Sequence, residues 1–276
     1  MKKFFALLVL VSALCSISAQ RVNETVTMFG KEQITGFTIN VDNAPANIVA
    51  DALADKFQNQ YYMKGTAKKG YHVYENQPCS AFGESRYDIY FTTVTLGKKK
   101  DQTTQLTLVV SNGNMNCITF ANDPRTSRNI VTFLENFPAD VEAYKVKLRI
   151  AELKNEVAKL KKDRAAMEKD RVKVNDKIGS TNDELKRNTD RIEKLTAEIE
   201  KNQAEFNQTH DPALGEAISK SVKEKQSLQK TQDSKQKTLL GLNNDIVKLN
   251  KKLEENAKTI EAKEAELKQL EQQQQK

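Results

Sequence analysis

The stretch NQTHDP, residues 207–212, separates two heptad repeats and decides the fold of the second half of the chain. Upstream, seam residues recur at alternating spacings of three and four from Val146 to Phe206, and downstream they recur in the same way from Leu214 to Leu270. A sustained seven-residue repeat keeps one seam of a helix facing a partner helix and imposes a left-handed supercoil. The sequence therefore predicts two long coiled-coil helices whose exposed sides carry Lys, Glu, Gln and Asn.

The break between the repeats has the features of a turn followed by a new helix. Asp is a favoured N-cap residue, and Pro fits the first helical position because its missing N–H has no helical partner there. Asp211-Pro212 therefore predicts a helix start after a turn near 207–211. Since the repeats are nearly equal in length, we expect an antiparallel two-helix hairpin over residues 141–272, about 90 Å long. The alternative is a parallel homodimer formed through each helix.

Polar residues inside the repeats predict the register of this hairpin. If the numbers of facing seam residues sum to 420, Asn188 faces Gln232 and Arg164 faces Asn256. A shift by one heptad would place Arg164 against Lys263. Because a polar group without a partner in a dry seam costs about 1–3 kcal/mol, we expect the first register and its two polar layers.

Two glycines are candidates for a hinge. The residue numbers of Gly179 and Gly241 also sum to 420, so the predicted register places these glycines at the same height on facing helices. Glycine costs about 1 kcal/mol relative to alanine inside a helix, and Gly-Ser pairs are known kink sites. One hypothesis is that the outer half of the hairpin bends here; the alternative is a pair of tolerated glycines facing solvent.

A stripe of small residues borders the first part of the seam. It consists of Ala151, Ala158, Ala165 and Val172. The stripe is a candidate for lateral contact with a third helix, from another chain or from the root of the hairpin itself, and a homo-oligomer would follow from the first case. The alternative is that these residues only favour the helical conformation.

Residues 20–140 differ in composition because nearly all aromatic residues lie there. Apolar alternation and turn signals predict strands at 34–41, 61–67, 71–74, 87–96, 106–110 and 117–120. One helix is predicted to open at Pro45, and another opens at Pro124 and is interrupted or bent at Pro138. This order predicts an α+β head with an antiparallel sheet, of which a ferredoxin-like arrangement is one variant.

The N-terminus has the pattern of a secretory signal peptide. Lys2 and Lys3 precede a short apolar run, and small residues end the segment at Ala19, where we expect cleavage. The run is too short for a membrane span, which needs about 20 apolar residues. We therefore expect export to the periplasm or the surface of a Gram-negative bacterium, with residues 273–276 as a disordered tail.

The charge balance restricts the classes of partner. The formal net charge of +7 is a mild excess spread among many acidic residues, and a solvated hairpin surface accounts for it. The alternative is a weak association with an anionic membrane surface. We expect no nucleic-acid partner, because the chain has no clusters in which basic and aromatic residues alternate, and we expect the partner to be a protein.

Two cysteines remain after the expected cleavage, Cys79 and Cys117. An oxidising compartment favours a disulfide between an even pair, and the alternative is two buried thiols that pack as small apolar residues. Neither these cysteines nor the widely separated His72 and His210 have the spacing of a zinc site. We find no nucleophile with a base and no glycine-rich phosphate loop, so we expect no catalytic residue, cofactor or metal.

The order of segments resembles uncharacterised exported proteins of the Bacteroidota that join a small α+β head to a C-terminal coiled coil. The residues that carry the resemblance lie at 36–41, 54–57, 64–69 and 87–90, with the sequences GFTINV, ADKF, KGTAKK and YDIY. The resemblance extends over the chain in order. It implies an exported compartment and this arrangement of domains, and it does not indicate an activity.

These features favour a non-enzymatic structural or interaction protein of the cell envelope that uses its coiled-coil hairpin to space or bind a partner. One alternative is a periplasmic holdase-type chaperone, which would grip unfolded clients between hairpins. Another alternative is an enzyme with a cleft in the head.

Overall fold

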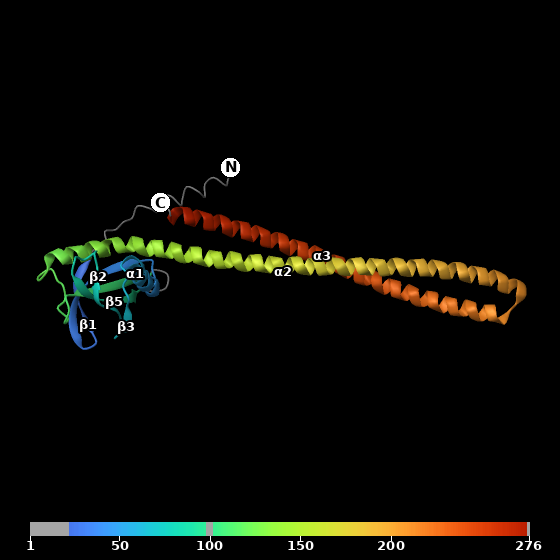
Figure 1. The fold of residues 1–276 in the computed structure, drawn as a ribbon, viewed down its shortest axis with the longest axis horizontal. Helices are drawn as coiled ribbons and strands as arrows, with labels where there is room; N and C mark the ends of the chain where they lie inside the picture. The colour runs from blue at the N-terminus through green and yellow to red at the C-terminus, as the bar shows by residue number, and fades with distance from the viewer. Residues whose placement is uncertain (1–21, 98–101, 275–276) are drawn as a thin grey trace. The chain divides into compact units, whose positions relative to one another are not determined.

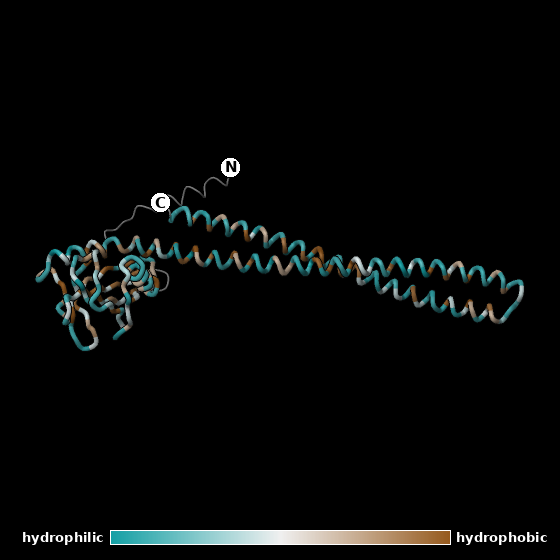
Figure 2. The backbone as a smooth tube through the Cα atoms, in the orientation of Figure 1, coloured by the Kyte–Doolittle hydropathy of each residue, from teal (hydrophilic) through white to brown (hydrophobic). Residues whose placement is uncertain are grey.

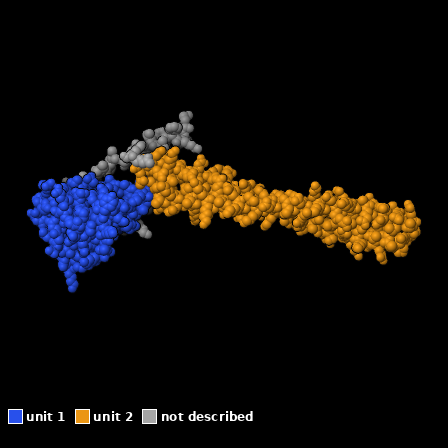
Figure 3. All heavy atoms as spheres, viewed as in Figure 1, with its two compact units in different colours: residues 1–149 blue, residues 150–276 orange. Residues whose placement is uncertain are grey.

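The structure is a computed structural model that describes residues 22–97 and 102–274 in two compact units, residues 1–149 and 150–276 (Figure 3). We call the described part of the first unit the head and that of the second the hairpin. The expected signal peptide, residues 1–19, lies outside the described residues, as do residues 275 and 276 of the expected disordered tail. No helix among the described residues is long and apolar enough to cross a membrane.

The head contains a six-stranded antiparallel sheet with the order β1-β2-β6-β5-β4-β3 (Figure 1). Its strands are β1 (Asn23–Phe29), β2 (Glu32–Asp42), β3 (Thr66–Lys68), β4 (Tyr71–Pro78), β5 (Arg86–Leu96) and β6 (Thr103–Ser111). Helix α1 (Ala46–Gln60) lies between β2 and β3, and α2 (Pro124–Thr209) follows β6. The α+β class and the antiparallel sheet are confirmed. The ferredoxin-like variant is not observed, because four strands separate α1 from α2 and no strand follows α2 among the described residues.

One face of the sheet packs against both helices and forms the main core. Alternate residues of neighbouring strands, such as Phe37, Phe91 and Leu108, are fully buried on this face together with Phe57 of α1 and Phe137 of α2. Successive side chains of a strand point to opposite faces, so this alternation directs one large apolar set toward the helices. Burying each such side chain stabilises the fold by about 1.5–3 kcal/mol.

The other face holds a smaller cluster, in which Phe29 contacts Tyr71 and Tyr90 with ring centroids 5.5 and 5.0 Å apart. At Gly36, β2 passes close to β6, and the missing side chain leaves room for Val109 and the Leu108 carbonyl. A Cβ there would lie 2.6 Å from Val109 Cγ2 and 2.7 Å from that carbonyl oxygen. The head therefore closes a second core with its first two strands.

Two local predictions for the head were wrong, and one strand was not predicted. Strand β1 was not predicted, because its residues are mostly exposed and carry no apolar alternation on a buried face. Residues 61–65 form no strand, since Tyr62 has the left-handed φ of 57°. The segment 117–120 contributes only an isolated bridge between Ser111 and Cys117.

Pro138 does not interrupt α2, contrary to expectation, because α2 continues through it to Thr209. The helix is held on both sides of the proline, since Phe137 and Val141 are both fully buried in the head. Their burial offsets the backbone hydrogen bond that proline removes. The same contacts move the division between the units to residue 149, nine residues beyond the predicted boundary at 140.

The second unit is a helical hairpin formed by the rest of α2 and by α3 (Pro212–Gln274), which lie side by side and cross in the view of Figure 1. Most residues of both helices are hydrophilic, and apolar residues recur at intervals along them (Figure 2). The turn is His210 and Asp211, and Asp211 Oδ1 accepts a hydrogen bond of 2.9 Å from the Ala213 amide. The predicted N-cap and helix start at Pro212 are confirmed, whereas the expected tail is too long because the helix continues through Gln274.

Ion pairs between the helices establish the register. Heptad positions e and g flank the seam, and the predicted register places e opposite e on one flank and g opposite g on the other. The e–e pairs Lys154–Glu271 and Lys161–Glu264 span 2.9 and 2.7 Å. On the other flank, the g–g pair Arg191–Glu224 spans 2.8 Å. A shift by one heptad would separate all three pairs, so the hairpin has the predicted register.

Candidate functional site

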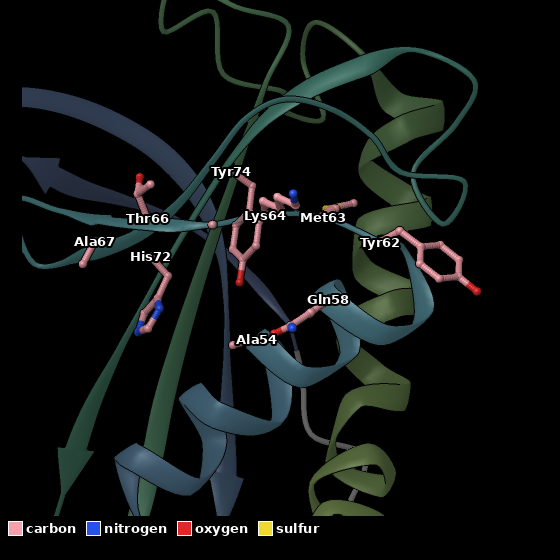
Figure 4. A pocket seen from close by; sticks show the side chains of 10 residues that line it. Ala54, Gln58, Tyr62, Met63, Lys64, Thr66, Ala67, His72 and Tyr74 are labelled. Atoms are coloured by element: carbon pink, nitrogen blue, oxygen red, sulfur yellow. The ribbon is translucent and has the colours of Figure 1, made fainter.

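An open pocket of about 650 Å³ lies in the head between α1 and the segment that leads into β3 and β4 (Figure 4). The side chains of Gln58, Lys64, Thr66, His72 and Tyr74 provide its polar groups. Gly65 lies against Tyr74, where an added Cβ would come within 2.6 Å of the ring. Glycine therefore allows the segment to cross directly over this tyrosine.

Two of the aromatic side chains that line the pocket, His72 and Tyr74, are held by packing. The His72 ring stacks on Phe91 with centroids 4.5 Å apart and an interplanar angle of 5°. Burial raises the pKa of the Tyr74 hydroxyl above its usual value of 10.0, so this phenol stays protonated at neutral pH. The polar lining can donate and accept hydrogen bonds, but it contains no carboxylate or thiol. Among the described residues, no group of three or more metal-ligating side chains lies close enough to hold an ion.

The structure keeps Cys79 and Cys117 apart, and both are free thiols. Cys79 belongs to the core beneath the helices, and Cys117 packs against the cluster on the opposite face of the sheet. Burial raises the pKa of the Cys79 thiol from 9.0 to about 11, although nearby Lys56 opposes the shift. Of the two alternatives that the sequence leaves open, this structure therefore has two packed thiols and no bond between Cys79 and Cys117.

The first predicted polar layer, Asn188 and Gln232, lies within the hairpin seam. Both residues are half-buried, and Gln232 Nε2 donates a hydrogen bond of 3.0 Å to Thr189 Oγ1, the neighbour of Asn188. The seam thus accommodates this amide by pairing it with a hydroxyl one position along the helix.

The second layer, Arg164 and Asn256, is arranged differently from the prediction. Asn256 Nδ2 donates a hydrogen bond of 3.3 Å to the Leu160 carbonyl, while its buried Oδ1 has no hydrogen-bond partner among the described residues. Arg164 is exposed and pairs with Glu168 at 3.1 Å. Its guanidinium leaves the seam because water and Glu168 solvate the charge better than a dry interface does.

Gly179 and Gly241 are both exposed, and a Cβ added to either would meet nothing within 4 Å. Packing within the hairpin therefore does not require glycine at these positions. The hinge stays a hypothesis. Ala151, Ala158, Ala165 and Val172 are likewise all exposed, so no other part of the described chain covers the predicted lateral contact.

The two flanks of the hairpin differ in charge, a feature that our reading of the seam alone missed. On the e–e flank, the α2 residues from the middle of the hairpin to the turn are Asn175, Asn182, Thr189, Thr196 and Gln203. Their counterparts on α3 are Asn250, Asn243, Gln236, Gln229 and Val222. We call these positions the neutral flank. By contrast, every g position of α2 from Glu156 to Glu205 is charged.

No protein-family model and no curated protein matches the chain.

Proposed function

We propose that the protein is exported to the envelope of a Gram-negative bacterium and acts there as a structural or interaction protein. In this proposal the hairpin spaces or binds a protein partner, and no catalysis is involved. The observation that carries it is the register of the hairpin, in which two helices pair along their length. Such pairing makes a stiff element of about 90 Å, whose extent suits spacing or contact along a surface.

The distribution of apolar side chains supports this function. The seam residues Leu153, Val157, Leu195, Leu253 and Ile260 are all buried between the helices. They are therefore engaged by the hairpin itself and are not free to grip unfolded clients. This distribution favours the spacing or binding role over the holdase-type chaperone.

Two measurements test the proposal. Fractionation of producing cells should place the protein in the envelope, and deletion of residues 2–19 should retain it in the cytoplasm. Affinity capture from envelope extract should recover a protein partner with the full chain and lose it when residues 150–276 are deleted. Retention of the full chain in the cytoplasm, or capture that is independent of the hairpin, would contradict the proposal.

The holdase alternative has its own test. A chaperone of this type would suppress the aggregation of reduced or heat-denatured client proteins at a few-fold molar excess. We expect no suppression beyond that given by an equal mass of an inert protein. Suppression that disappears with the hairpin deletion would favour the chaperone over the structural role.

A further inference from the structure

Exposed apolar side chains gather on one side of the hairpin, around its middle. In the described part of the hairpin, three large hydrophobic side chains are exposed: Val172 by 55%, Leu240 by 65% and Val247 by 67%. All three occupy heptad position b, which lies outside position e on the same flank. The residue numbers of Val172 and Val247 sum to 419, close to the 420 of facing seam residues, so the two side chains lie at nearly the same height on the two helices. Together they form an apolar outer edge to the neutral flank.

The seam beneath this region buries less than the seam on either side. Arg164 and Arg171 occupy seam positions but are exposed, and Met167 and Val174 are only half-buried. Leu153 nearer the head and Leu195 nearer the turn are, by contrast, almost fully buried. The α2 side of the seam is therefore less apolar in the middle of the hairpin, although Leu253 opposite Met167 is buried there, and apolar side chains lie exposed on the outer edge.

We propose that the neutral flank is the interface between two copies of this chain, which pack their hairpins side by side as a four-helix bundle around a two-fold axis. A two-fold interface brings the same surface of each copy together. On the charged flank this would place many charges of one sign against each other, which costs several kcal/mol. Amide and hydroxyl side chains both donate and accept hydrogen bonds, so the neutral flank can face itself.

The size of the flank is sufficient for a stable dimer. From Val172 to Phe206 it extends for about 50 Å, and two adjacent helices present a face about 15 Å wide, which gives about 750 Å² per copy. A standard interface buries about 800 Å² per partner. The charged residues at position b nearer the turn would lie at the rim, where charged residues are usual; they are Lys186, Glu193, Glu200 and Asp233.

The inference concerns only the oligomeric state, so it is tested separately from the proposed function. Sedimentation equilibrium of the full chain between about 1 and 100 μM should show a dimer with a micromolar or lower dissociation constant, the range expected of a standard interface. The triple variant Val172→Glu, Leu240→Glu and Val247→Glu should weaken the dimer at least tenfold, because six carboxylates would face each other across the axis. All three sites are exposed, so the variant should retain the helical circular dichroism of the parent.

A matched control adds the same three charges to the other side of the hairpin. Ser180→Glu, Ser227→Glu and Ser234→Glu replace exposed residues at position c, outside the charged flank. This control should dimerise as the parent does. A monomeric parent, or equal weakening by the two triple variants, would overturn the proposal.

A second measurement locates the contact directly. A photoreactive benzoylphenylalanine at position 243, on the neutral flank, should cross-link two copies of the chain. The same group at position 234 should not. Cross-linking at 234 as strong as at 243, or at neither position, would overturn the assignment of the dimer to the neutral flank.

Discussion

Gly36 and Gly179 illustrate, at the scale of single residues, how the same residue type serves opposite purposes in the two units. A side chain at Gly36 would clash with the Leu108 backbone, whereas one at Gly179 would enter open space. The first glycine is required by the close approach of β2 to β6. The second is not required by any contact among the described residues. It lowers the stability of the helix, because glycine loses more conformational entropy on folding than alanine does.

Substitution by alanine should therefore have opposite effects at these two positions. Gly36→Ala should destabilise the head by about 1–3 kcal/mol, as expected for overpacking. Gly179→Ala should stabilise the hairpin by up to about 1 kcal/mol because alanine favours the helix. Urea unfolding followed by circular dichroism gives both values. A stabilising effect at Gly36 would show that the close approach of β2 to β6 does not depend on glycine.

The buried thiol of Cys79 should make the stability of the head depend on pH in the alkaline range. Folding raises its pKa from 9.0 to about 11, so the folded state holds the proton more tightly than the unfolded state does. The resulting stabilisation is complete below about pH 8.5 and is lost as the pH rises toward 11. The free energy of unfolding should fall over this range, and Cys79→Ala should make the fall shallower. Parallel pH profiles for the parent and the variant would contradict this account.

At the scale of elements, the paired helices were predictable because their information is local and periodic. The heptad spacing, the Asp211-Pro212 start and the polar layers lie within short stretches of sequence, and together they gave the hairpin and its register. The exit of Arg164 from the seam was not predictable from the repeat, because it depends on the competing ion pair with Glu168.

The head was less predictable because long-range contacts decide its details. Strand β1 exists through pairing with β2 and through the contacts of Phe29 with Tyr71 and Tyr90, which lie far along the chain. Pro138 is tolerated inside α2 because of core contacts that no local pattern indicates. The pocket was missed for the same reason, since its lining comes from α1, β4 and the segment between them.

Distance measurements should verify the pairing of the two helices. Spin labels on non-cysteine side chains at positions 153 and 267 should lie side by side within a single molecule, diluted with unlabelled protein. Labels at 167 and 267 should be farther apart, because the fourteen residues of helix between 153 and 167 add an axial separation of about 21 Å. A long 153–267 distance would instead support a parallel pairing of helices between chains.

At the scale of the whole molecule, the hairpin can be shortened without changing its seam. Deletion of residues 182–195 together with 225–238 removes facing segments of two heptads each and keeps the remaining partners in register. We expect the shortened protein to stay folded but to lose function if the hairpin acts as a spacer, and to keep function if it only binds. Thermal unfolding and the envelope capture assay measure the two effects.

Deletion of residues 182–195 alone provides the control. It leaves α3 two heptads too long, so the facing residues no longer match beyond the deletion. The hairpin should then lose several seam contacts that the doubly shortened form keeps, and unfold at a lower temperature than that form. Equal unfolding temperatures for the two deletions would indicate that the register contributes little to stability.

The turn at His210 and Asp211 joins two helices that have their own seam and their own ends. Both residues are exposed, and His210 has a left-handed φ of 52°. If a protease cleaved the chain there, the two fragments would remain associated as a heterodimer. Its melting temperature would then depend on dilution, whereas that of an intact monomeric hairpin would not. The peptide bond at the turn thus determines whether the pairing of the two helices is intramolecular or depends on protein concentration.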